Sequence, residues 1–407
     1  MRALRFVFAA LLLTAAGCSP LGEVGPGKTP SAEVKLVFKR TVFGGLEQWP
    51  GDRLLPALDA FKASCAVILK RTVSDPMGGV AEYGSVGDWV PACEAARRQS
   101  TQSEAAAAKF FETWFEPVQV FNGEESIGLF TGYYEPELNG SRKQSRKFHT
   151  PLYAKPTDLV QVDLGVFRAN LKGERIAGKV IDGKLVPYAS RAEIVSGRSG
   201  AAITKPLVFV DDAVAAFFLQ IQGSGRVRLD TGDTIRAAFD GQNGHSYTAI
   251  GRVLVDRGEI QRSQLSMQTI RIWLDSNPEK AAALMNENAS YVFFKELPID
   301  DPSKGADGAQ GVALTAQASL AVDLKYHALG ALMWVDAKAP SADSSNEDSG
   351  LHRLFVAQDT GGAIRGPVRG DVYWGVGREA ESIAGRMAHK GRLHVLLPKP
   401  VSARLNR

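Results

Sequence analysis

The sequence is poor in the side chains that most often bind metal ions. Its 407 residues include only 3 cysteines and 6 histidines, the histidines are scattered, and no Cys-x-x-Cys motif occurs. Zinc and related ions need several cysteine, histidine or carboxylate ligands at suitable spacing. We therefore expect no metal site, and no motif implies a cofactor.

The sequence also lacks a strong net charge and, beyond its N-terminus, a long apolar run. A net charge of +4 is too small to indicate nucleic acid as a partner, although it would not oppose an anionic polymer. No later apolar run is long enough to span a bilayer. Hydrophobic residues make up 44% and charged residues 23%, as is typical of globular proteins, and the length suits two domains.

The N-terminus has the pattern of an export signal. A short basic start is followed by the apolar run Phe6–Leu13 and by small residues that end at Cys18. This pattern predicts a secretory signal peptide over residues 1–18 and resembles a bacterial lipoprotein signal, in which Cys18 becomes the acylated first residue. Ser19 would then suit sorting to the outer membrane, with residues 19–35 as a flexible tether. The alternative is an ordinary signal peptide that is cleaved nearby.

The two remaining cysteines, Cys65 and Cys93, fall in two predicted helices. Apolar residues recur at helical spacing between residues 54 and 68, and Asp88 is a candidate cap for a second short helix. In an exported protein, a disulfide between the two cysteines would close a loop of 28 residues and stabilise the fold by about 3–4 kcal/mol. The alternative is a pair of buried free thiols. We predict the disulfide.

From residue 118 the pattern changes to short strands and turns. The adjacent Tyr133 and Tyr134 follow a Thr-Gly pair and could serve as platforms for sugar rings or simply as packing. Further on, the apolar run Ala216–Gln222 is predicted as a strand that leads into a Gly-Ser-Gly turn containing Ser224. No phosphate-binding lysine pattern accompanies this turn, so nucleotide binding is not indicated.

The stretch His352–Gly377 has the strongest features of a functional site. It begins as an alternating apolar strand, breaks at Asp359 into a Thr-Gly-Gly turn, and resumes after Asp371 as Val-Tyr-Trp. Glycines around both carboxylates would let a polymeric ligand approach the backbone closely. Asp371 has the more apolar surroundings in sequence, which favours the protonated form of a carboxyl group.

Several motifs together resemble one family, the membrane-bound lytic murein transglycosylases A, whose last domain is named for three aspartates. Asp323, Asp359 and Asp371 fit those aspartates. The matching segments are FTGYYEP at 130–136, QGSG at 222–225, NGHSY at 243–247, ASYVFFK at 289–295 and DTGGAIRGPVRGDVYWGVG at 359–377. The segments occur in the family's order and span most of the chain.

The resemblance implies a mainly β fold with peripheral helices, of the α+β class. It implies a double-psi β-barrel built from segments on both sides of an inserted β domain, with the substrate groove between them. The domains expected after the tether are the first part of the barrel with helical elements (36–135), the insert (136–260), the second part of the barrel with the three aspartates (261–398) and a tail (399–407).

The resemblance also implies an enzyme that is anchored to the outer membrane, faces the periplasm and acts on peptidoglycan glycan strands. Members of the family cleave the β-1,4 bond between N-acetylmuramic acid and N-acetylglucosamine and leave a 1,6-anhydromuramic acid end. The sugar's own C6 hydroxyl attacks, so one carboxyl group can act first as acid and then as base. Cell-wall synthesis proteins are candidate partners, and nothing requires an oligomer, so a monomer is expected.

Asp371 and Asp359 are the candidate catalytic residues, with Asp371 as the acid. Asp359 would support the site by hydrogen bonds to its surroundings or to the sugar, or would only stabilise its turn. Asp323 is expected to be structural. The candidate glycan-binding residues, taken chiefly from the resemblance, are Thr131, Tyr133, Tyr134, Gln222 and Ser224.

Two other functions stay open. A cell-wall glycan hydrolase would use Asp359 and Asp371 as a pair, and its product would be heavier than the anhydro product by one water. A non-catalytic lipoprotein that only binds peptidoglycan would digest none, whether or not Asp371 were replaced.

Overall fold

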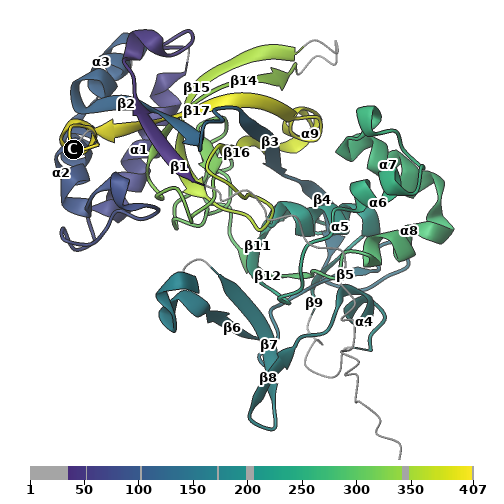
Figure 1. The fold of residues 1–407 in the computed structure, drawn as a ribbon. Coiled ribbons are helices and arrows are strands. Elements are labelled where there is room, and N and C mark those ends of the chain that lie inside the picture. The colour runs from purple at the N-terminus through teal and green to yellow at the C-terminus, as the bar shows by residue number, and fades with distance from the viewer. Residues whose placement is uncertain are drawn as a thin grey trace, which may run out of the picture. The chain divides into compact units, whose positions relative to one another are not determined.

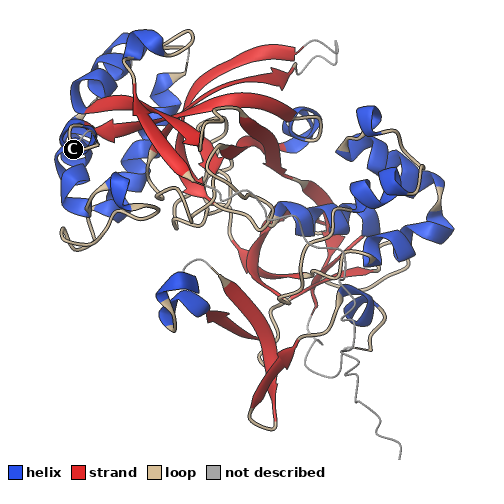
Figure 2. Ribbon diagram, in the orientation of Figure 1, coloured by secondary structure: helices blue, strands red, loops and turns tan. Residues whose placement is uncertain are grey.

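The computed structural model describes residues 35–51, 53–100, 103–171, 174–198, 206–341 and 348–405. The predicted signal peptide, Cys18 and all of the predicted tether except Lys35 lie outside these residues. Strands predominate and helices lie at the periphery, as predicted (Figures 1 and 2). Within the described ranges, no helix combines the length and the apolar character that crossing a membrane requires.

The barrel is part of an eight-stranded sheet. In order across the sheet its strands are β1 (Leu36–Arg40), β2 (Phe115–Asn122), β17 (Ala388–Pro398), β14 (Leu332–Pro340), β15 (Asp348–Asp359), β13 (Ser319–Ala321), β16 (Arg369–Val376) and β3 (Gly128–Glu135). Because β17 pairs with β3 as well as with β14, the strands from β17 round to β3 close into a ring. This ring is the predicted barrel, and it joins β3, which precedes the insert, with five strands that follow the insert.

Three helices pack against the barrel, namely α1 (Leu54–Ile68), α2 (Val86–Arg98) and α3 (Glu104–Trp114). Their apolar faces share one hydrophobic core with the barrel strands, in which Phe61, Trp89 and Phe111 are fully buried. Cys65 of α1 and Cys93 of α2 form a disulfide, with their Cα atoms 5.1 Å apart. The disulfide thus joins two helices of this core.

Helix α2 begins earlier than the sequence pattern indicated. Its N-cap is Ser85, whereas Asp88, the expected cap, lies inside the first turn. The Asp88 carboxylate accepts a hydrogen bond from the Ser85 backbone N–H at 2.8 Å. In such a capping box the acidic residue stands three positions after the cap, which explains why Asp88 was mistaken for the cap itself.

The inserted domain contains a six-stranded sheet. In order across the sheet its strands are β12 (Val292–Leu297), β11 (Thr234–Gln242), β10 (Gly225–Leu229), β4 (Glu137–Ser141), β9 (Pro206–Val210) and β5 (Thr150–Tyr153). The predicted end of the insert near residue 260 is too early, because β12 pairs with β11 up to Leu297. This pairing joins strands about 50 residues apart, so no local pattern in the sequence indicates it.

The run Ala216–Gln222 is helical, and its prediction as a strand was wrong. It belongs to α5 (Ala213–Gln222), where Asp212 accepts hydrogen bonds from the backbone N–H groups of Val214 and Ala215. Gly223 ends the helix in a left-handed conformation with φ 87°. Phe217, Phe218 and Leu219 are all buried, so neither helical nor strand periodicity is visible in the sequence.

Other helices and a small sheet complete the described chain. Helices α6 (Ile250–Asp256), α7 (Met267–Ser276) and α8 (Pro278–Asn286) share a hydrophobic cluster with α5. The chain after α9 (Gly377–Ala384) contacts this cluster, because Gly385 O accepts a hydrogen bond from Met267 N at 3.1 Å. The remaining strands and α-helices are β6 (Val160–Asp163), β7 (Arg175–Ile181), β8 (Lys184–Pro187), α4 (Arg191–Val195) and α10 (Lys399–Ser402).

Candidate active site

Two of the three aspartates lie on either side of one residue, Ala321 of β13. Ala321 pairs with Asp359 of β15 on one side and with Asp371 of β16 on the other. Neighbouring strands are about 4.8 Å apart, so the backbones of the two aspartates are separated by about 10 Å. Asp371 pairs in turn with Thr131 of β3. Directly opposed residues project to the same face of a sheet, so these side chains share one face of the barrel.

Asp371 accepts a single side-chain hydrogen bond among the described residues. Thr131 Oγ1 donates to Asp371 Oδ1 at 2.5 Å, and Arg369 Nη2 donates to the same threonine oxygen at 2.8 Å. Burial raises the pKa of Asp371, while the Arg369 charge and the Thr131 hydrogen bond act in the opposite direction. The raised pKa favours the protonated carboxyl group that a general acid needs.

Asp359 accepts hydrogen bonds from two donors. Tyr133 OH donates to Oδ2 at 2.9 Å, and Ala309 N donates to Oδ1 at 3.0 Å. Burial raises the pKa of Asp359, these hydrogen bonds oppose the shift, and the nearby charge of Asp371 adds to it. Because both of its oxygens already accept hydrogen bonds from the protein, Asp359 is better suited to anchoring than to activating a water molecule.

Asp323 is buried and fixes the loop between β15 and β16. Its Oδ1 accepts a hydrogen bond from Lys325 N at 3.1 Å, and its Oδ2 accepts one from Gly366 N at 2.8 Å. The guanidinium of Arg365 lies 3.9 Å from Oδ1. Gly366 and Arg365 belong to the loop that carries the chain from Asp359 to Asp371, whereas Lys325 belongs to the turn after Asp323 itself, and these contacts are consistent with a structural role.

The adjacent tyrosines have different surroundings. Tyr133 donates to Asp359, and its ring centroid lies 5.2 Å from that of Tyr373. Tyr134 is only 4% exposed, and its backbone N–H donates to Gln222 Oε1 at 3.1 Å. Burial and the carboxylate of Glu381 raise the pKa of Tyr134. Tyr133 therefore belongs to the aspartate site, whereas Tyr134 connects the barrel with the end of α5.

The other expected glycan-binding residues are held within the insert. Ser224 Oγ accepts a hydrogen bond from Phe239 N at 3.1 Å, beside the bulge of β11. Gln222 contacts the barrel only at the Tyr134 backbone in the hydrogen bonds described. The structure thus brings Thr131, Tyr133, Asp359 and Asp371 together, and it describes no direct contact of Gln222 or Ser224 with the two aspartates.

Arg369 is a site residue that the sequence analysis missed. It stands two positions before Asp371 on β16, so both side chains project to the same face of the strand. The guanidinium is fixed by hydrogen bonds to the backbone oxygens of Leu129 and Gly370 as well as to Thr131. The i, i+2 spacing to Asp371 could have identified it, but the strand was expected to resume only after Asp371, so Arg369 fell in the preceding loop.

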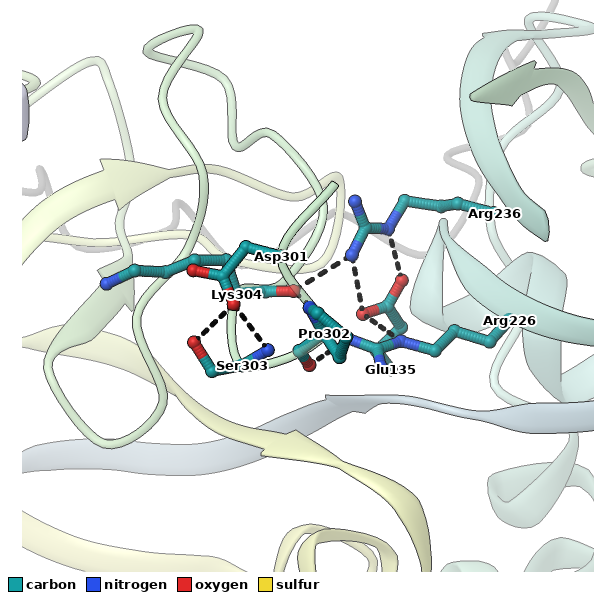
Figure 3. A network of polar contacts seen from close by, with 7 residues as sticks. All are labelled: Glu135, Arg226, Arg236, Asp301, Pro302, Ser303 and Lys304. Carbon is teal, nitrogen blue, oxygen red and sulfur yellow. Dashed lines mark hydrogen bonds and ion pairs between the residues drawn. The ribbon is translucent and has the colours of Figure 1, made fainter. Parts of the chain in front are cut away.

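A second group of residues missed by the sequence analysis surrounds Glu135, the last residue of β3 (Figure 3). Arg236 Nε donates to Glu135 Oε1 at 2.6 Å, and Arg226 Nε donates to Oε2 at 3.3 Å. Both guanidiniums also donate to the backbone oxygen of Lys304, at 2.9 and 3.0 Å. Glu135, Arg226 and Arg236 are all buried. This network joins the barrel, two strands of the insert and the loop that returns from the insert to the barrel.

Tyr373 lies between the network around Glu135 and the aspartates. Burial raises the pKa of its phenol, and Glu135 and Asp359 both contribute to the rise. Gly305 packs so closely against this tyrosine that a Cβ atom there would lie 2.3 Å from the phenolic oxygen. The loop from residue 300 to 311, to which the sequence analysis assigned no role, therefore packs against the site.

Among the described residues, no group of three or more His, Cys, Asp or Glu side chains is arranged to hold a metal ion. One family model, described as the MltA specific insert domain, matches residues 129–295, and another, described as the 3D domain, matches residues 318–397. The first match contains the whole β4–β11 region, and the second contains Asp323, Asp359 and Asp371.

The sequence is also similar to a membrane-bound lytic murein transglycosylase A from Escherichia coli strain K12. The two chains are 33% identical over 275 residues, a match that covers 67% of this chain and 66% of that protein. This chain thus spans about two thirds of the length of that relative.

Solved structures are similar over most of the chain. A membrane-bound lytic murein transglycosylase from Agrobacterium tumefaciens has a TM-score of 0.77 at 29% identity, with 90% of this chain and 99% of that chain covered. MltA from Neisseria gonorrhoeae has a TM-score of 0.72 at 30% identity, with 89% and 93% covered. E. coli MltA with bound chitohexaose has a TM-score of 0.62 at 26% identity, with 89% and 94% covered. The chain therefore belongs to the membrane-bound lytic murein transglycosylase A family of lytic transglycosylases.

Proposed function

We propose that this chain cleaves the β-1,4 bond between N-acetylmuramic acid and N-acetylglucosamine in peptidoglycan and leaves a 1,6-anhydromuramic acid end. The setting of Asp371 carries the proposal. Its pKa is raised by burial, and only one of its carboxyl oxygens accepts a hydrogen bond from the described residues. Such a group can hold a proton at a pH at which an exposed aspartate is ionised, and can donate it to a leaving oxygen.

In the first step Asp371 acts as an acid. It donates its proton to the glycosidic oxygen, the bond between C1 of muramic acid and that oxygen breaks, and N-acetylglucosamine leaves as an alcohol. Positive charge develops at C1 while Asp371 becomes a carboxylate. Proton transfer of this kind contributes about 10²–10⁴-fold to the rate.

In the second step the same carboxylate acts as a base. The C6 hydroxyl oxygen of muramic acid attacks C1, and its proton passes to Asp371. A bond between C1 and the C6 oxygen forms, the acid is regenerated, and no water is consumed. The reaction needs neither a protein nucleophile nor a second carboxylate that activates water.

The hydrogen bonds of Asp359 favour this mechanism over hydrolysis by a carboxylate pair. An inverting hydrolase needs a second carboxylate that takes a proton from water, and a retaining one needs a nucleophile. Tyr133 and Ala309 donate to the two oxygens of Asp359, which reduces its ability to do either. Asp359 instead holds Tyr133 and the loop before β13 in place.

We also propose that the glycan strand binds along the barrel face that carries Thr131, Tyr133 and Asp371. The E. coli relative with bound chitohexaose supports glycan binding by this fold. Gln222 and Ser224 of the insert and the edge of Tyr134 on β3 stay proposals for further contacts with the glycan. In this view the predicted groove lies between the insert and the barrel.

We propose that Cys18 carries lipid and holds the enzyme at the outer membrane, facing the periplasm. The relatives named membrane-bound support membrane association, while the specific membrane and the anchor come from the sequence pattern alone. Radioactive palmitate should label the wild type but not Cys18→Ala, and fractionation should place the label in the outer membrane. Partners in cell-wall synthesis and a monomeric state remain predictions.

The activity is tested with purified sacculi and product masses. We expect soluble fragments with the mass of anhydromuramic ends, and none from Asp371→Asn. Fragments heavier by one water would replace the proposed reaction with hydrolysis. Binding of sacculi without digestion by the folded wild type would indicate a non-catalytic lipoprotein, and digestion by Asp371→Asn at the wild-type rate would show that another residue is the acid.

A further inference from the structure

Arg369, Thr131 and Asp371 form a chain of hydrogen bonds. Arg369 Nη2 donates to Thr131 Oγ1 at 2.8 Å, and Thr131 Oγ1 lies 2.5 Å from Asp371 Oδ1. The backbone oxygens of Leu129 and Gly370 fix the guanidinium by further hydrogen bonds. The register of the parallel strands β3 and β16 places Leu129 opposite Arg369 and Thr131 opposite Asp371. The pairing of β3 with β16 therefore positions the three residues of this chain of hydrogen bonds.

Donor and acceptor chemistry gives the chain of hydrogen bonds one direction. A guanidinium has only donors, so the Thr131 oxygen must accept from Arg369. The single hydroxyl proton of Thr131 is then available for Asp371. Asp371 Oδ1 is therefore an acceptor, and the acid proton must lie on Oδ2. Among the described residues Oδ2 has no hydrogen-bond partner, so it is left for the substrate.

We propose that Arg369 is a positioning residue that acts through Thr131 and places the acid proton of Asp371 on Oδ2. The inference rests on the proposed function, because it takes Asp371 as the acid. Without Arg369, the Thr131 hydroxyl could rotate and accept a hydrogen bond from a protonated Oδ1. The acid would then point at Thr131 instead of the glycosidic oxygen. Arg369 thus decides which of two protonated forms of the acid is populated.

The same arrangement assists the proton transfer itself. When Oδ2 gives its proton to the glycosidic oxygen and the C1–O bond breaks, the carboxylate charge spreads to Oδ1. The Thr131 proton stays on Thr131, and its hydrogen bond to Oδ1 becomes charge-assisted, which makes it roughly twice as strong. The pair therefore stabilises the transition state more than the ground state, which raises kcat.

The charged and titratable groups around Asp371 give the inference a signature in the pH profile. They are Arg369 on its own strand, Tyr133 on β3 and Asp359 on β15. Of these, the Arg369 charge opposes the rise in the pKa of Asp371, as does the hydrogen bond from Thr131. Loss of either should raise that pKa further and move the alkaline limb of the kcat profile to higher pH.

The test compares Arg369→Met, Thr131→Val and Thr131→Ser in the full chain, with kcat and KM measured on defined glycan strands across pH. We expect the first two to lower kcat by about 10- to 100-fold with little change in KM. Thr131→Ser should retain most of the rate, because it keeps the hydroxyl. Arg97→Met and Thr113→Val remove the same groups from exposed positions on α2 and α3, and they should match the wild type.

A double variant tests whether Arg369 acts through Thr131. In the Thr131→Val background, Arg369→Met should lower kcat by much less than it does alone, because the route to the acid is already broken. If the two substitutions lowered kcat by independent factors that multiply in the double variant, the inference would be overturned. An alkaline limb of the kcat profile that stays at the wild-type pH in both single variants would also overturn it. Wild-type rates in both single variants, beside an inactive Asp371→Asn, would overturn this inference and leave the proposed function standing.

Discussion

Asp371 and Glu135 are carboxylates on neighbouring strands that arginine reaches in different ways. Glu135 lies at the end of β3, four residues after Thr131, and β16 with Asp371 runs beside it. Arg236 and Arg226 donate directly to Glu135 at 2.6 and 3.3 Å. Arg369 reaches Asp371 only through the Thr131 hydroxyl. The two carboxylates therefore differ in the number of arginines around them and in the Thr131 side chain that separates Asp371 from Arg369.

A carboxylate and arginine thus build a structural ion pair at Glu135 and the setting of the proposed acid at Asp371. Two direct guanidiniums compensate the charge of Glu135, so this residue holds the barrel, the insert and the returning loop together. The indirect contact leaves burial as the larger influence on Asp371, whose pKa is raised. The protonated form of Asp371 is therefore favoured, as the proposed acid requires, while Glu135 keeps its two arginine partners.

The largest expected effect separates the two residues by activity. Asp371→Asn should lower the rate of muropeptide release from sacculi by about 10²–10⁴-fold, because the proton donor is lost. Its folding should be intact by circular dichroism, since an asparagine can still accept the Thr131 hydrogen bond. If Asp371→Asn kept more than a tenth of the wild-type rate, Asp371 would not be the proton donor, and the functional difference between Asp371 and Glu135 would be contradicted.

The next effect separates the two residues by stability. Glu135→Gln should lower the free energy of unfolding in urea by about 3–5 kcal/mol, because it leaves two buried guanidiniums without a compensating charge. Glu116→Gln is the matched control, since Glu116 pairs with Arg40 at 2.8 Å on the surface, and it should change stability by no more than about 1 kcal/mol. Equal losses in the two variants would show that burial of the network adds nothing.

A smaller effect appears in the pH dependence of stability. The folded-state pKa values of Asp371 and Asp359 are raised above the ordinary value of 3.8, so the folded chain binds more protons than the unfolded chain in the interval above that value. Their stabilising contribution is complete below pH 3.8 and is lost as the pH rises through the raised values. Asp371→Asn should reduce this loss, by about 1.4 kcal/mol per unit of pKa difference removed. Urea unfolding at a series of pH values measures it, and an unchanged slope would count against the raised pKa.

The smallest expected effect concerns the support of Asp359. Tyr133→Phe removes one of the two donors to that carboxylate and should lower the free energy of unfolding by about 1 kcal/mol. The pKa of Asp359 should rise, because the Tyr133 hydrogen bond opposes the shift that burial causes. Carbon-13 NMR of the carboxyl groups, compared with Asp359→Asn, measures that pKa. The control is Tyr247→Phe at a position that is 44% exposed, and it should leave that resonance unchanged.

Much of the fold could be predicted from local patterns and motif order. The alternating apolar pattern before Asp359 corresponds to β15, and the predicted disulfide between Cys65 and Cys93 is present. Prediction failed where burial on all sides hid the periodicity, as in Ala216–Gln222, which is helical. It also failed for the end of the insert, because β12 joins its sheet through a long-range pairing with β11.

In the candidate site, too, some residues could be predicted from local sequence patterns and others depend on long-range contacts. Asp359 and Asp371 could be found from glycine-rich strand ends and from the family motifs. Arg369 was within reach through its i, i+2 spacing to Asp371. By contrast, Arg226 and Arg236 look like ordinary arginines in apolar strands, and nothing local marks Glu135 as their partner. Their role depends on three segments far apart in the sequence.

The sequence by itself determined the chemistry of the side chains, the periodicity of most strands and helices, and the motifs that mark the family. Only the tertiary structure decided which carboxylate contacts arginine directly and which contacts it through a hydroxyl. The physical reason is that burial and charge compensation depend on neighbours brought together by strand register, as when β3 places Thr131 opposite Asp371. An aspartate becomes an acid through that environment, and residue type alone does not specify it.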